Sequence, residues 1–400
     1  MTDTVASLMA EIADLGTDPR RGGYSRPVYS TAELDLRAWF VAHAERRGLD
    51  VETDRNGILW AWAGGVGEGA IVTGSHLDSV PGGGAYDGPL GVASALVAFD
   101  RLAESGVTGR RAIAVFPEEE GSRFGLACLG SRLLTGAIDA DRVRALTDAD
   151  GITFAEASRA AGVAPDHLGA DPEALARIGT FIELHVEQGR GLADLERPIA
   201  VASSILGHGR WRISFTGEGN HAGTTLMGDR RDPMVAAAVL IAEVQRLGRR
   251  VPDARATVGR LVPTPGGTNV IASRVDLWLD VRHPDDVVTR YLVDEITAVA
   301  AAVARDQGCA SAMTEESFSA TVAFDPGLRD RLAGALDDAP VLGTGAGHDA
   351  GVLKEHVSTA MLFVRNPTGV SHAPGEAVED GDAEAGARAL ATSIAELIGV

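Results

Sequence analysis

Apolar residues along the chain alternate between short runs and longer periodic segments. Strand-like runs begin at residues 71 and 112, and residues 31–47 and 91–105 have the spacing of amphipathic helices. Strands that alternate with helices are typical of a sheet covered by helices. An α/β fold is therefore expected from residue 30 to about residue 150.

The pattern changes near residue 208. Four strands and two helices are expected after this point: strands at residues 211–216, 257–263, 274–282 and 310–320, and helices at residues 233–247 and 286–307. Their order, β-α-β-β-α-β, is the split βαβ arrangement of a ferredoxin-like α+β unit. The α/β pattern then resumes with a helix at residues 326–338, a strand at 359–365 and an Ala-rich helix at 380–398.

Five potential metal ligands stand in short segments rich in glycine or carboxylates: His76, Asp87, Glu120, His185 and His372. Several follow strand-like runs, and the carboxyl ends of strands in an α/β sheet face one crevice where ligands bind. Asp87 is the candidate for a shared ligand, because the glycines before it let the backbone turn tightly. The set suits two divalent cations that share one carboxylate, and it predicts hydrolysis by a water that the metals activate.

Neighbouring residues could support such a site. Asp78 follows His76 at a spacing of two, so an extended backbone lets its carboxylate accept from the free imidazole N–H of His76. Glu118, Glu119 and Glu120 repel one another unless cations or solvent neutralise them, so one can bind metal while its neighbour transfers protons.

Each of these features alone has an ordinary structural interpretation. A His-x-Asp is usually a surface or capping pair, a Glu triplet is usually a solvated helix start, and a histidine such as His185 in an apolar strand is usually a core residue. Their convergence at strand ends favours the metal site. Because His372 lies in the second α/β segment, the catalytic domain must be discontinuous: residues 1–207 and 321–400, with residues 208–320 inserted.

Composition narrows the class of protein. The chain has 400 residues, 45% of them hydrophobic, and a net charge of −20, which argues against nucleic acid or an anionic membrane as a partner. Only Cys128 and Cys309 are present, so no disulfide framework is expected and a reducing compartment fits. With no signal-peptide pattern and no apolar run long enough to span a bilayer, the expected location is cytoplasmic.

Seven segments together match a known pattern: SHLDSVPGGGAYDGPLGV, EEEGSRFG, ELHVEQG, NHAGTT, GGTNVI, GAGHDA and GVSHAPGE. They resemble the M20 metallopeptidase superfamily, in the amidohydrolase branch that contains N-carbamoyl-L-amino acid hydrolases, allantoate amidohydrolases and ureidopropionases. The resemblance covers nearly the whole chain. It implies a di-metal catalytic domain and an inserted domain that dimerises and acts as a lid.

The resemblance also implies roles for individual residues. It implies two metal ions per subunit, one held by His76, Asp87 and His185 and the other by Asp87, Glu120 and His372. Ligands without cysteine suit Zn, Mn, Co or Ni. Glu119 would be the general base. In a homodimer, His221 would reach the active site of the other subunit, and Gln188, Asn269 and Arg282 would hold the substrate.

Some of these residues have other interpretations. Without the resemblance, His221 is a loop histidine that bonds its own backbone. Arg282 either pairs with Asp280 or is a surface charge, whereas its functional role would be bidentate capture of a substrate carboxylate. His348 and Asp349 are expected to order the metal site or a loop, and His208 to line the cleft or cap a strand. The family usually has Pro at the position of Leu226, so the adjoining loop is a point of departure.

The leading functional hypothesis is metal-dependent hydrolysis of a linear ureido acid, with release of ammonia and carbon dioxide. N-carbamoyl-L-amino acids and allantoate are the candidate substrates, and residues 220–225 followed by residues 230–232 slightly favour allantoate. One alternative is an aminoacylase or dipeptidase of the wider superfamily. The other is a catalytically silent dimeric binding protein on the same fold.

Overall fold

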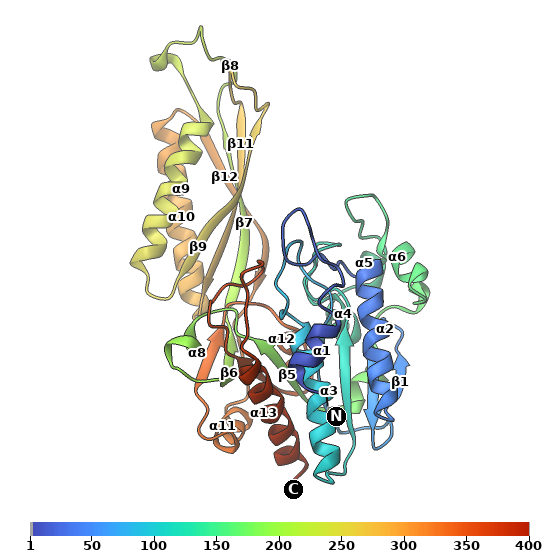
Figure 1. Cartoon of the computed structure of the whole chain (residues 1–400). Helices are drawn as coiled ribbons and strands as arrows, with labels where there is room; N and C mark the ends of the chain where they lie inside the picture. The colour runs from blue at the N-terminus through green and yellow to red at the C-terminus, as the bar shows by residue number, and fades with distance from the viewer. Residues whose placement is uncertain (1–2, 400) are drawn as a thin grey trace. The chain divides into compact units, whose positions relative to one another are not determined.

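The computed structural model of the chain describes residues 3–399, which divide into two compact units. The first unit consists of Met1–Ser204 and Ala323–Val400, and the second unit is the intervening segment Ile205–Val322. Figure 1 shows the order of elements along the chain.

The first unit is built on a nine-stranded mixed sheet with the order β1-β2-β4-β3-β5-β15-β6-β13, and β14 pairs with β6. The strands are β1 (Asp50–Thr53), β2 (Leu59–Ala63), β3 (Ala70–His76), β4 (Arg111–Phe116), β5 (Ile178–Val186), β6 (Ile199–Ile205), β13 (Val322–Ala323), β14 (Val341–Thr344) and β15 (Ser358–Val364). The four central strands, β4, β3, β5 and β15, run parallel to one another. Their carboxyl ends therefore meet at one edge of the sheet.

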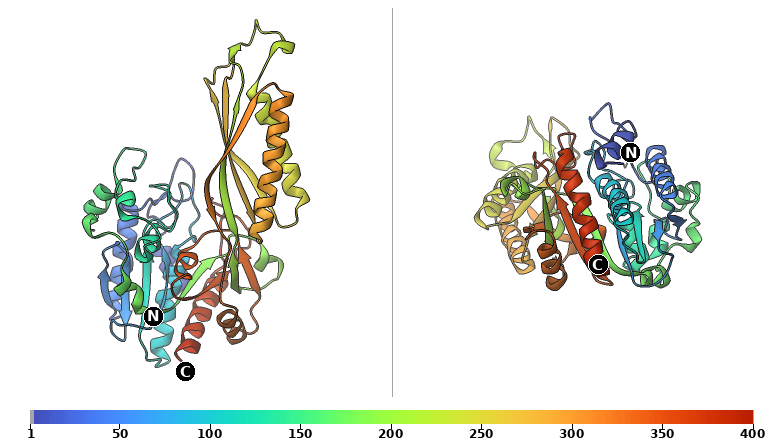
Figure 2. Two further views of the ribbon diagram at one scale, coloured as in Figure 1. Left: turned by 180° about the vertical axis from the view of Figure 1, so that it is seen from behind. Right: turned by 60° about the horizontal axis from the view of Figure 1, so that its bottom comes forward.

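Helices bury the apolar side chains of this sheet. One large core joins sheet residues to α1 (Val5–Glu11), α2 (Thr31–Arg46), α3 (Pro89–Glu104), α11 (Pro326–Ala335) and α13 (Asp380–Ile398). α3 and α13 lie side by side in both ribbon views (Figure 2). α3 is almost entirely buried, which its small and aliphatic residues permit, and Pro89 starts it with a preset backbone angle.

Shorter helices follow β4 and connect it to β5. They are α4 (Leu129–Thr135), α5 (Ala140–Arg144), α6 (Phe154–Ala160), a 3-10 turn at Pro165–His167 and α7 (Pro172–Arg177). A separate apolar cluster that includes Phe124, Leu133 and Phe154 holds part of this region together. Two further short helices, α8 (Gly191–Asp194) and α12 (Asp349–Leu353), follow β5 and β14.

The second unit is a four-stranded antiparallel sheet with two long helices. Its strands are β7 (Gly207–Thr216), β9 (Arg255–Thr264), β11 (Arg274–His283) and β12 (Ala310–Ser319), in the order β12-β7-β11-β9. Alternate residues of β7, such as Trp211 and Ile213, share a core with α9 (Pro233–Arg250) and α10 (Asp286–Asp306). β8 (Asn220–His221) and β10 (Val270–Ile271) form a separate two-stranded sheet.

The fold class predicted from the sequence, an α/β protein with an inserted ferredoxin-like unit, is confirmed. The second unit has the expected β-α-β-β-α-β order, and α13 has the bounds expected for the last helix, 380–398. The strands β1, β2, β6 and β14 and the helices between β4 and β5 were not predicted. Except for β6, which is as long as β3, these elements are short, so they carry little periodic signal.

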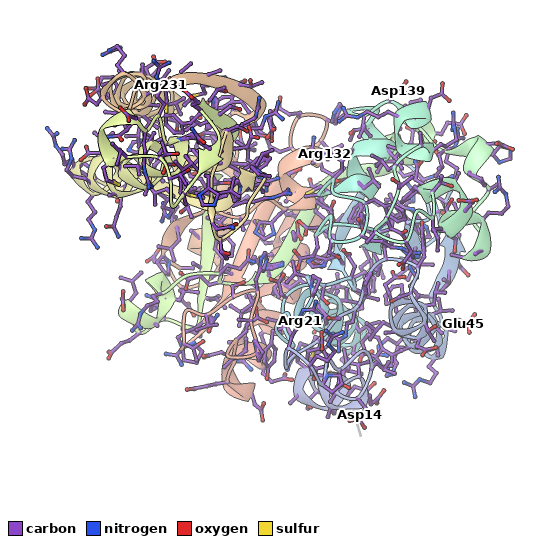
Figure 3. All side chains as sticks on the ribbon, turned by 90° about the horizontal axis from the view of Figure 1, so that it is seen from above. Asp14, Arg21, Glu45, Arg132, Asp139 and Arg231 are labelled. Atoms are coloured by element: carbon purple, nitrogen blue, oxygen red, sulfur yellow. The ribbon has the colours of Figure 1, made fainter. Side chains whose placement is uncertain are left out.

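Charged side chains of both signs lie on the surfaces of both units. Asp14, Glu45 and Asp139 are exposed in the first unit, and Arg231 is exposed in the second (Figure 3). Among residues 3–399, no helix combines the length and the apolar character that crossing a membrane requires.

Candidate metal centre

The parallel strands of the first unit deliver the candidate ligands to one edge of the sheet. His76 is the last residue of β3, and His185 is the second-last residue of β5. Glu120 lies in the loop after β4, and His372 lies in the loop after β15. Because these four strands are adjacent and parallel, their carboxyl ends form the crevice in which ligands of α/β sheets bind.

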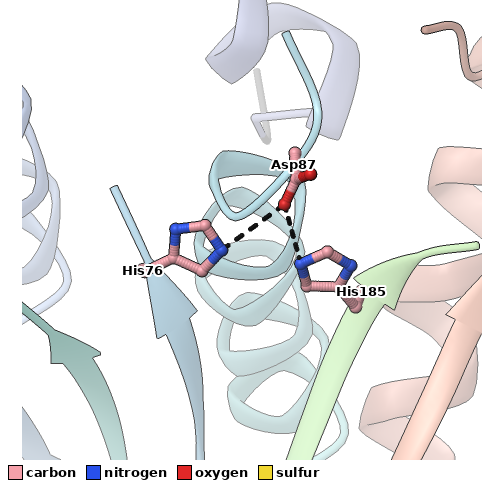
Figure 4. A group of neighbouring side chains, drawn as sticks. All are labelled: His76, Asp87 and His185. Atoms are coloured by element: carbon pink, nitrogen blue, oxygen red, sulfur yellow. Dashed lines mark ion pairs between the residues drawn. The ribbon is translucent and has the colours of Figure 1, made fainter. Parts of the chain in front are cut away.

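His76, Asp87 and His185 form a first triad, which Figure 4 shows. Oδ1 of Asp87 lies 3.5 Å from Nε2 of His76 and 3.2 Å from Nε2 of His185. All three residues are buried. Gly88 adopts φ +88° and has no room for a side chain, because a Cβ there would lie 2.5 Å from Cε1 of His76. This glycine lets the turn bring Asp87 against the two rings.

The backbone fixes the orientation of both imidazoles. Nδ1 of His76 lies 3.0 Å from the carbonyl oxygen of Asp78, and Nδ1 of His185 lies 2.9 Å from the carbonyl oxygen of Val186. These bonds place a proton on each Nδ1 and leave each Nε2 as a lone-pair donor. Both Nε2 atoms are buried and have no hydrogen-bond partner among the described residues. A metal ion would satisfy both.

Asp87, Glu120 and His372 form a second triad that shares Asp87 with the first. Nε2 of His372 lies 3.4 Å from Oδ2 of Asp87 and 3.5 Å from Oε2 of Glu120. The side chain of Glu120 is 6% exposed, whereas that of His372 is 50% exposed, so this triad opens to solvent. The two oxygens of Asp87 therefore face different triads.

Electrostatics around the triads fit cation binding. Burial, and next the charge of Asp87, raise the pKa of Glu120 to about 7. Burial raises the pKa of Glu119 well above its ordinary value. Burial alone would raise the pKa of Asp87, but the imidazoles of His185 and His372, when they are protonated, hold it well below its ordinary value. Buried carboxylates are costly to ionise without partners, and imidazole and carboxylate donors suit divalent transition metals, so the residues present fit two such ions.

Asp78 differs from its predicted role. Its carboxylate oxygen lies 3.6 Å from Nδ1 of His76, beyond a normal hydrogen bond, and the backbone carbonyl of Asp78 accepts from that ring instead. The carboxylate accepts the backbone N–H groups of Glu119, at 3.2 Å, and of Glu120, at 3.1 Å. Asp78 lies beyond the end of β3, and its carboxylate orders the loop that carries Glu119 and Glu120.

Glu119 and Gln188 lie beside the triads. Glu119 is 5% exposed, and its Oε2 lies 3.8 Å from Nε2 of His76. Nε2 of Gln188 donates to Oδ2 of Asp87 at 2.9 Å and lies 3.2 Å from Nε2 of His372. The Oε1 atom of Gln188 is buried and has no partner among the described residues.

The other three predicted site residues lie in the second unit. His221 is exposed on β8, where its Nδ1 accepts from the backbone N–H of Gly223 at 3.0 Å. The backbone carbonyl of Asn269 accepts from Ala222 at 3.0 Å, which brings Asn269 next to His221. Arg282 makes a bidentate contact with Asp280, at 2.8 and 3.0 Å. Within this unit, His221 and Arg282 thus make the local contacts that the sequence offered as their alternative interpretation.

The structure also places His348, Asp349, His208 and Leu226. His348 precedes α12, is buried, and packs against His185 with ring centroids 4.4 Å apart. Asp349 is fully buried and accepts from Oγ of Ser131 at 2.5 Å. His208 pairs with Arg282 across β7 and β11. Leu226 has φ −62°, an angle that proline also adopts, so this backbone would accommodate the usual Pro.

Two buried carboxylates at the centre were missed by the sequence reasoning. Glu183 stands two residues before His185 on β5 and accepts from Ser75 Oγ at 3.2 Å. Glu376 accepts the backbone N–H groups of Tyr86 and Asp87. The spacing of Glu183 from His185 was a usable signal, since residues i and i+2 of a strand share a face. The contact of Glu376 with residues far earlier in the chain left no local signal.

Comparisons with known proteins agree with this geometry. The model of peptidase family M20/M25/M40 matches residues 72–396. An N-carbamoyl-L-amino acid amidohydrolase of Geobacillus stearothermophilus is 34% identical, with 97% of each chain covered. The allantoate amidohydrolase of Escherichia coli K12 is 31% identical, covering 96% of this chain and 95% of its own. The crystal structure of an amidase of the hydantoinase/carbamoylase family from Burkholderia multivorans superposes with a TM-score of 0.86 at 31% identity, covering 98% of this chain and 96% of that one.

Proposed function

Because the chain belongs to peptidase family M20/M25/M40, in its hydantoinase/carbamoylase branch of amidohydrolases, we propose that it hydrolyses a linear ureido acid, an N-carbamoyl-L-amino acid or allantoate. The observation that carries the proposal is the pair of triads that share Asp87. We further propose that the triads bind two divalent ions, of Zn, Mn, Co or Ni, one through His76 and His185 and the other through Glu120 and His372.

The ions would lower the pKa of a water and polarise the substrate carbonyl. Glu119 takes the proton of the attacking water and returns it to the leaving nitrogen. Its carboxylate lies beside His76 and is buried, which excludes bulk water from the proton transfer. Attack on the ureido carbonyl breaks the C–N bond to the acid, and the released carbamate decomposes to carbon dioxide and ammonia.

Substrate binding is assigned to four polar residues. The support is most direct for Gln188. Its Nε2 donates to Asp87, and its buried Oε1 has no partner among the described residues, so Oε1 is available to accept a hydrogen bond from the substrate. Arg282 would bind the substrate carboxylate through the fork that it extends to Asp280 here. Asn269 would add a hydrogen bond. His221, from the other subunit of a homodimer, would donate to the developing oxyanion, a contribution of about 3 kcal/mol.

The test is ammonia release by protein that is stripped of metal and reloaded with Mn²⁺ or Zn²⁺. The panel is allantoate, several N-carbamoyl-L-amino acids, 3-ureidopropionate and one N-acetyl amino acid, with Glu119→Gln protein as the blank. Preference for one ureido acid supports the proposal and names the substrate. The sequence comparisons do not decide between the two candidates, because the identities to an N-carbamoyl-L-amino acid amidohydrolase and to an allantoate amidohydrolase are similar, 34% and 31%. Amine release from the N-acetyl compound without ammonia from the others would favour an acylase, and binding without turnover would favour a binding protein.

A further inference from the structure

The turn that carries Asp87 is held by a carboxylate from near the end of the chain. Oε1 of Glu376 accepts the backbone N–H of Tyr86 at 2.9 Å and the backbone N–H of Asp87 at 3.0 Å. Glu376 is only 6% exposed. Hydrogen bonds from backbone N–H groups to a buried carboxylate are strong, and losing the acceptor leaves one buried and one partly buried donor without this partner.

We propose that Glu376 is a positioning residue of the metal centre, which fixes the peptide of Asp87 and joins it to the loop of His372. The proposal rests on the proposed function, since it concerns ions held by the two triads. Among the described residues, the side-chain oxygens of Glu376 make no hydrogen bond to a side chain of either triad. Oε1 of Glu376 instead accepts the backbone N–H of Asp87, the residue that both triads share.

The sequence of the turn makes room for this contact. A Cβ at Gly84 would lie 2.2 Å from Oε1 of Glu376 and 2.3 Å from its carboxyl carbon, so only glycine lets the carboxylate reach the two N–H groups. The other end of the turn is held separately. Gly83 exchanges two backbone hydrogen bonds with Tyr24, at 2.9 and 3.0 Å, and the N–H of Gly82 donates to Oγ of Ser25 at 3.0 Å.

Glu376 also belongs to the segment that carries His372. Its own N–H donates to the carbonyl of Ala373 at 3.1 Å, which closes this segment into a turn. From the same segment, Oγ of Ser371 lies 3.4 Å from Oδ2 of Asp87. The loop of His372 and the turn of Asp87 are therefore linked at two points, and Glu376 makes the shorter contacts.

This linkage affects the two triads unequally. In the first triad, His76 and His185 lie on strands, and only Asp87 depends on the turn. In the second triad, both Asp87 and His372 lie on segments that Glu376 joins. Loss of Glu376 should therefore weaken the binding of the ion in the second triad more than the binding of the ion in the first.

The experiment measures ions bound per chain, by elemental analysis, at a series of buffered free Mn²⁺ concentrations. In Glu376→Ala, the dissociation constant of the weaker ion should rise by about 10- to 100-fold, as for other residues that orient metal ligands, while one ion is retained. Glu376→Gln keeps an oxygen that can accept both N–H groups, and it should bind both ions nearly as wild type does.

Asp54→Ala is the matched control. Asp54 is a carboxylate whose Oδ1 accepts the backbone N–H groups of Asn56 and Ile58, both at 2.9 Å, in the loop between β1 and β2. This variant should melt at a lower temperature than wild type and still bind two ions with wild-type affinity. If Glu376 had a purely structural role, Glu376→Ala would likewise melt at a lower temperature and still bind two ions with wild-type affinity.

Two results would overturn the proposal: two ions bound to Glu376→Ala at wild-type affinity, or a loss in Glu376→Gln as large as in Glu376→Ala. If Glu376→Ala does not fold, Gly84→Ala decides, because its methyl group displaces the carboxylate while Glu376 remains. That variant should lose the weaker ion, and retention of both ions contradicts the proposal. A wild-type chain that never binds a second ion contradicts the proposed function instead.

Discussion

The thiol of Cys128 lies 3.4 Å from Oε1 of Glu119 and donates a weak hydrogen bond to it. The same two residues are joined a second time, because the backbone N–H of Cys128 donates to the carbonyl oxygen of Glu119 at 2.7 Å. Cys128 is buried and has φ +54°, an uncommon angle for a residue with a side chain. Oε2 of Glu119 is left facing His76.

Replacing Cys128 by Ala should lower kcat several-fold, because loss of one weak hydrogen bond costs about 1 kcal/mol and frees the carboxylate of Glu119 to rotate. Steady-state ammonia release measures the effect. Cys309→Ala is the control, since Cys309 lies in the second unit and donates only to a backbone carbonyl, of Gln307. Equal activities of the two variants would show that the thiol does not position Glu119.

Glu119→Gln should lower turnover by at least about 100-fold, because an amide cannot accept the proton of the attacking water. Metal content should stay at the wild-type value, since Glu119 belongs to neither triad. Elemental analysis and ammonia release give the two readings. Glu118→Gln is the matched control. Glu118 accepts the backbone N–H groups of Arg123 and Phe124, and these contacts indicate a structural role. Retained turnover in Glu119→Gln would remove it from the role of base.

Mixed dimers test whether His221 acts across subunits. His221→Ala and Glu119→Gln chains, each inactive alone, should recover part of the activity when they are unfolded together and refolded as a mixture. A hybrid dimer would combine an intact Glu119 in one chain with an intact His221 in the other, and so contain one complete site. Activity that stays at the level of the separate variants, with hybrid dimers verified by mass, would mean that each site is built from one chain.

The buried carboxylates predict a pH dependence of the metal-free protein. Burial raises the pKa of Glu120 and Glu376 to about 7 and of Glu118 and Asp349 to about 8, from ordinary values of 4.5 for Glu and 3.8 for Asp. Because these pKa values are higher in the folded than in the unfolded chain, the stability they contribute is present below about pH 4 and is lost as the pH rises through 7 to 8. Burial lowers the pKa of His348, which acts in the opposite direction below 6.5.

The melting temperature of chelator-stripped protein should therefore fall between pH 5 and pH 8. In metal-loaded protein the fall should be much smaller, because the ions neutralise the carboxylates, and metal binding at pH 7 should release protons. Calorimetric melts at four pH values, with and without Mn²⁺, check the two statements about melting temperature. A stripped protein whose stability rises over this range would contradict the assigned directions.

Much of the fold was predictable because long periodic segments carry a strong signal. The helix 380–398 and the long strands of the inserted unit are segments of this kind. Four of the five candidate ligands, His76, Glu120, His185 and His372, were predictable because they end or follow apolar runs that become adjacent parallel strands. The contact between Glu376 and the N–H of Tyr86 was not, since 290 residues separate the two and only the folded chain brings them together. The bond from His76 to a carbonyl instead of a carboxylate depends on the path of one peptide.

We propose that two ions, held by triads that share Asp87, drive hydrolysis of a ureido acid. A titration of metal-free protein with Mn²⁺ tests this requirement, with ammonia release from the preferred ureido acid followed against ions added per chain. We expect no release without metal and a rise that levels off at two ions per chain. Full activity in the metal-free protein, or a plateau at one ion, would contradict it.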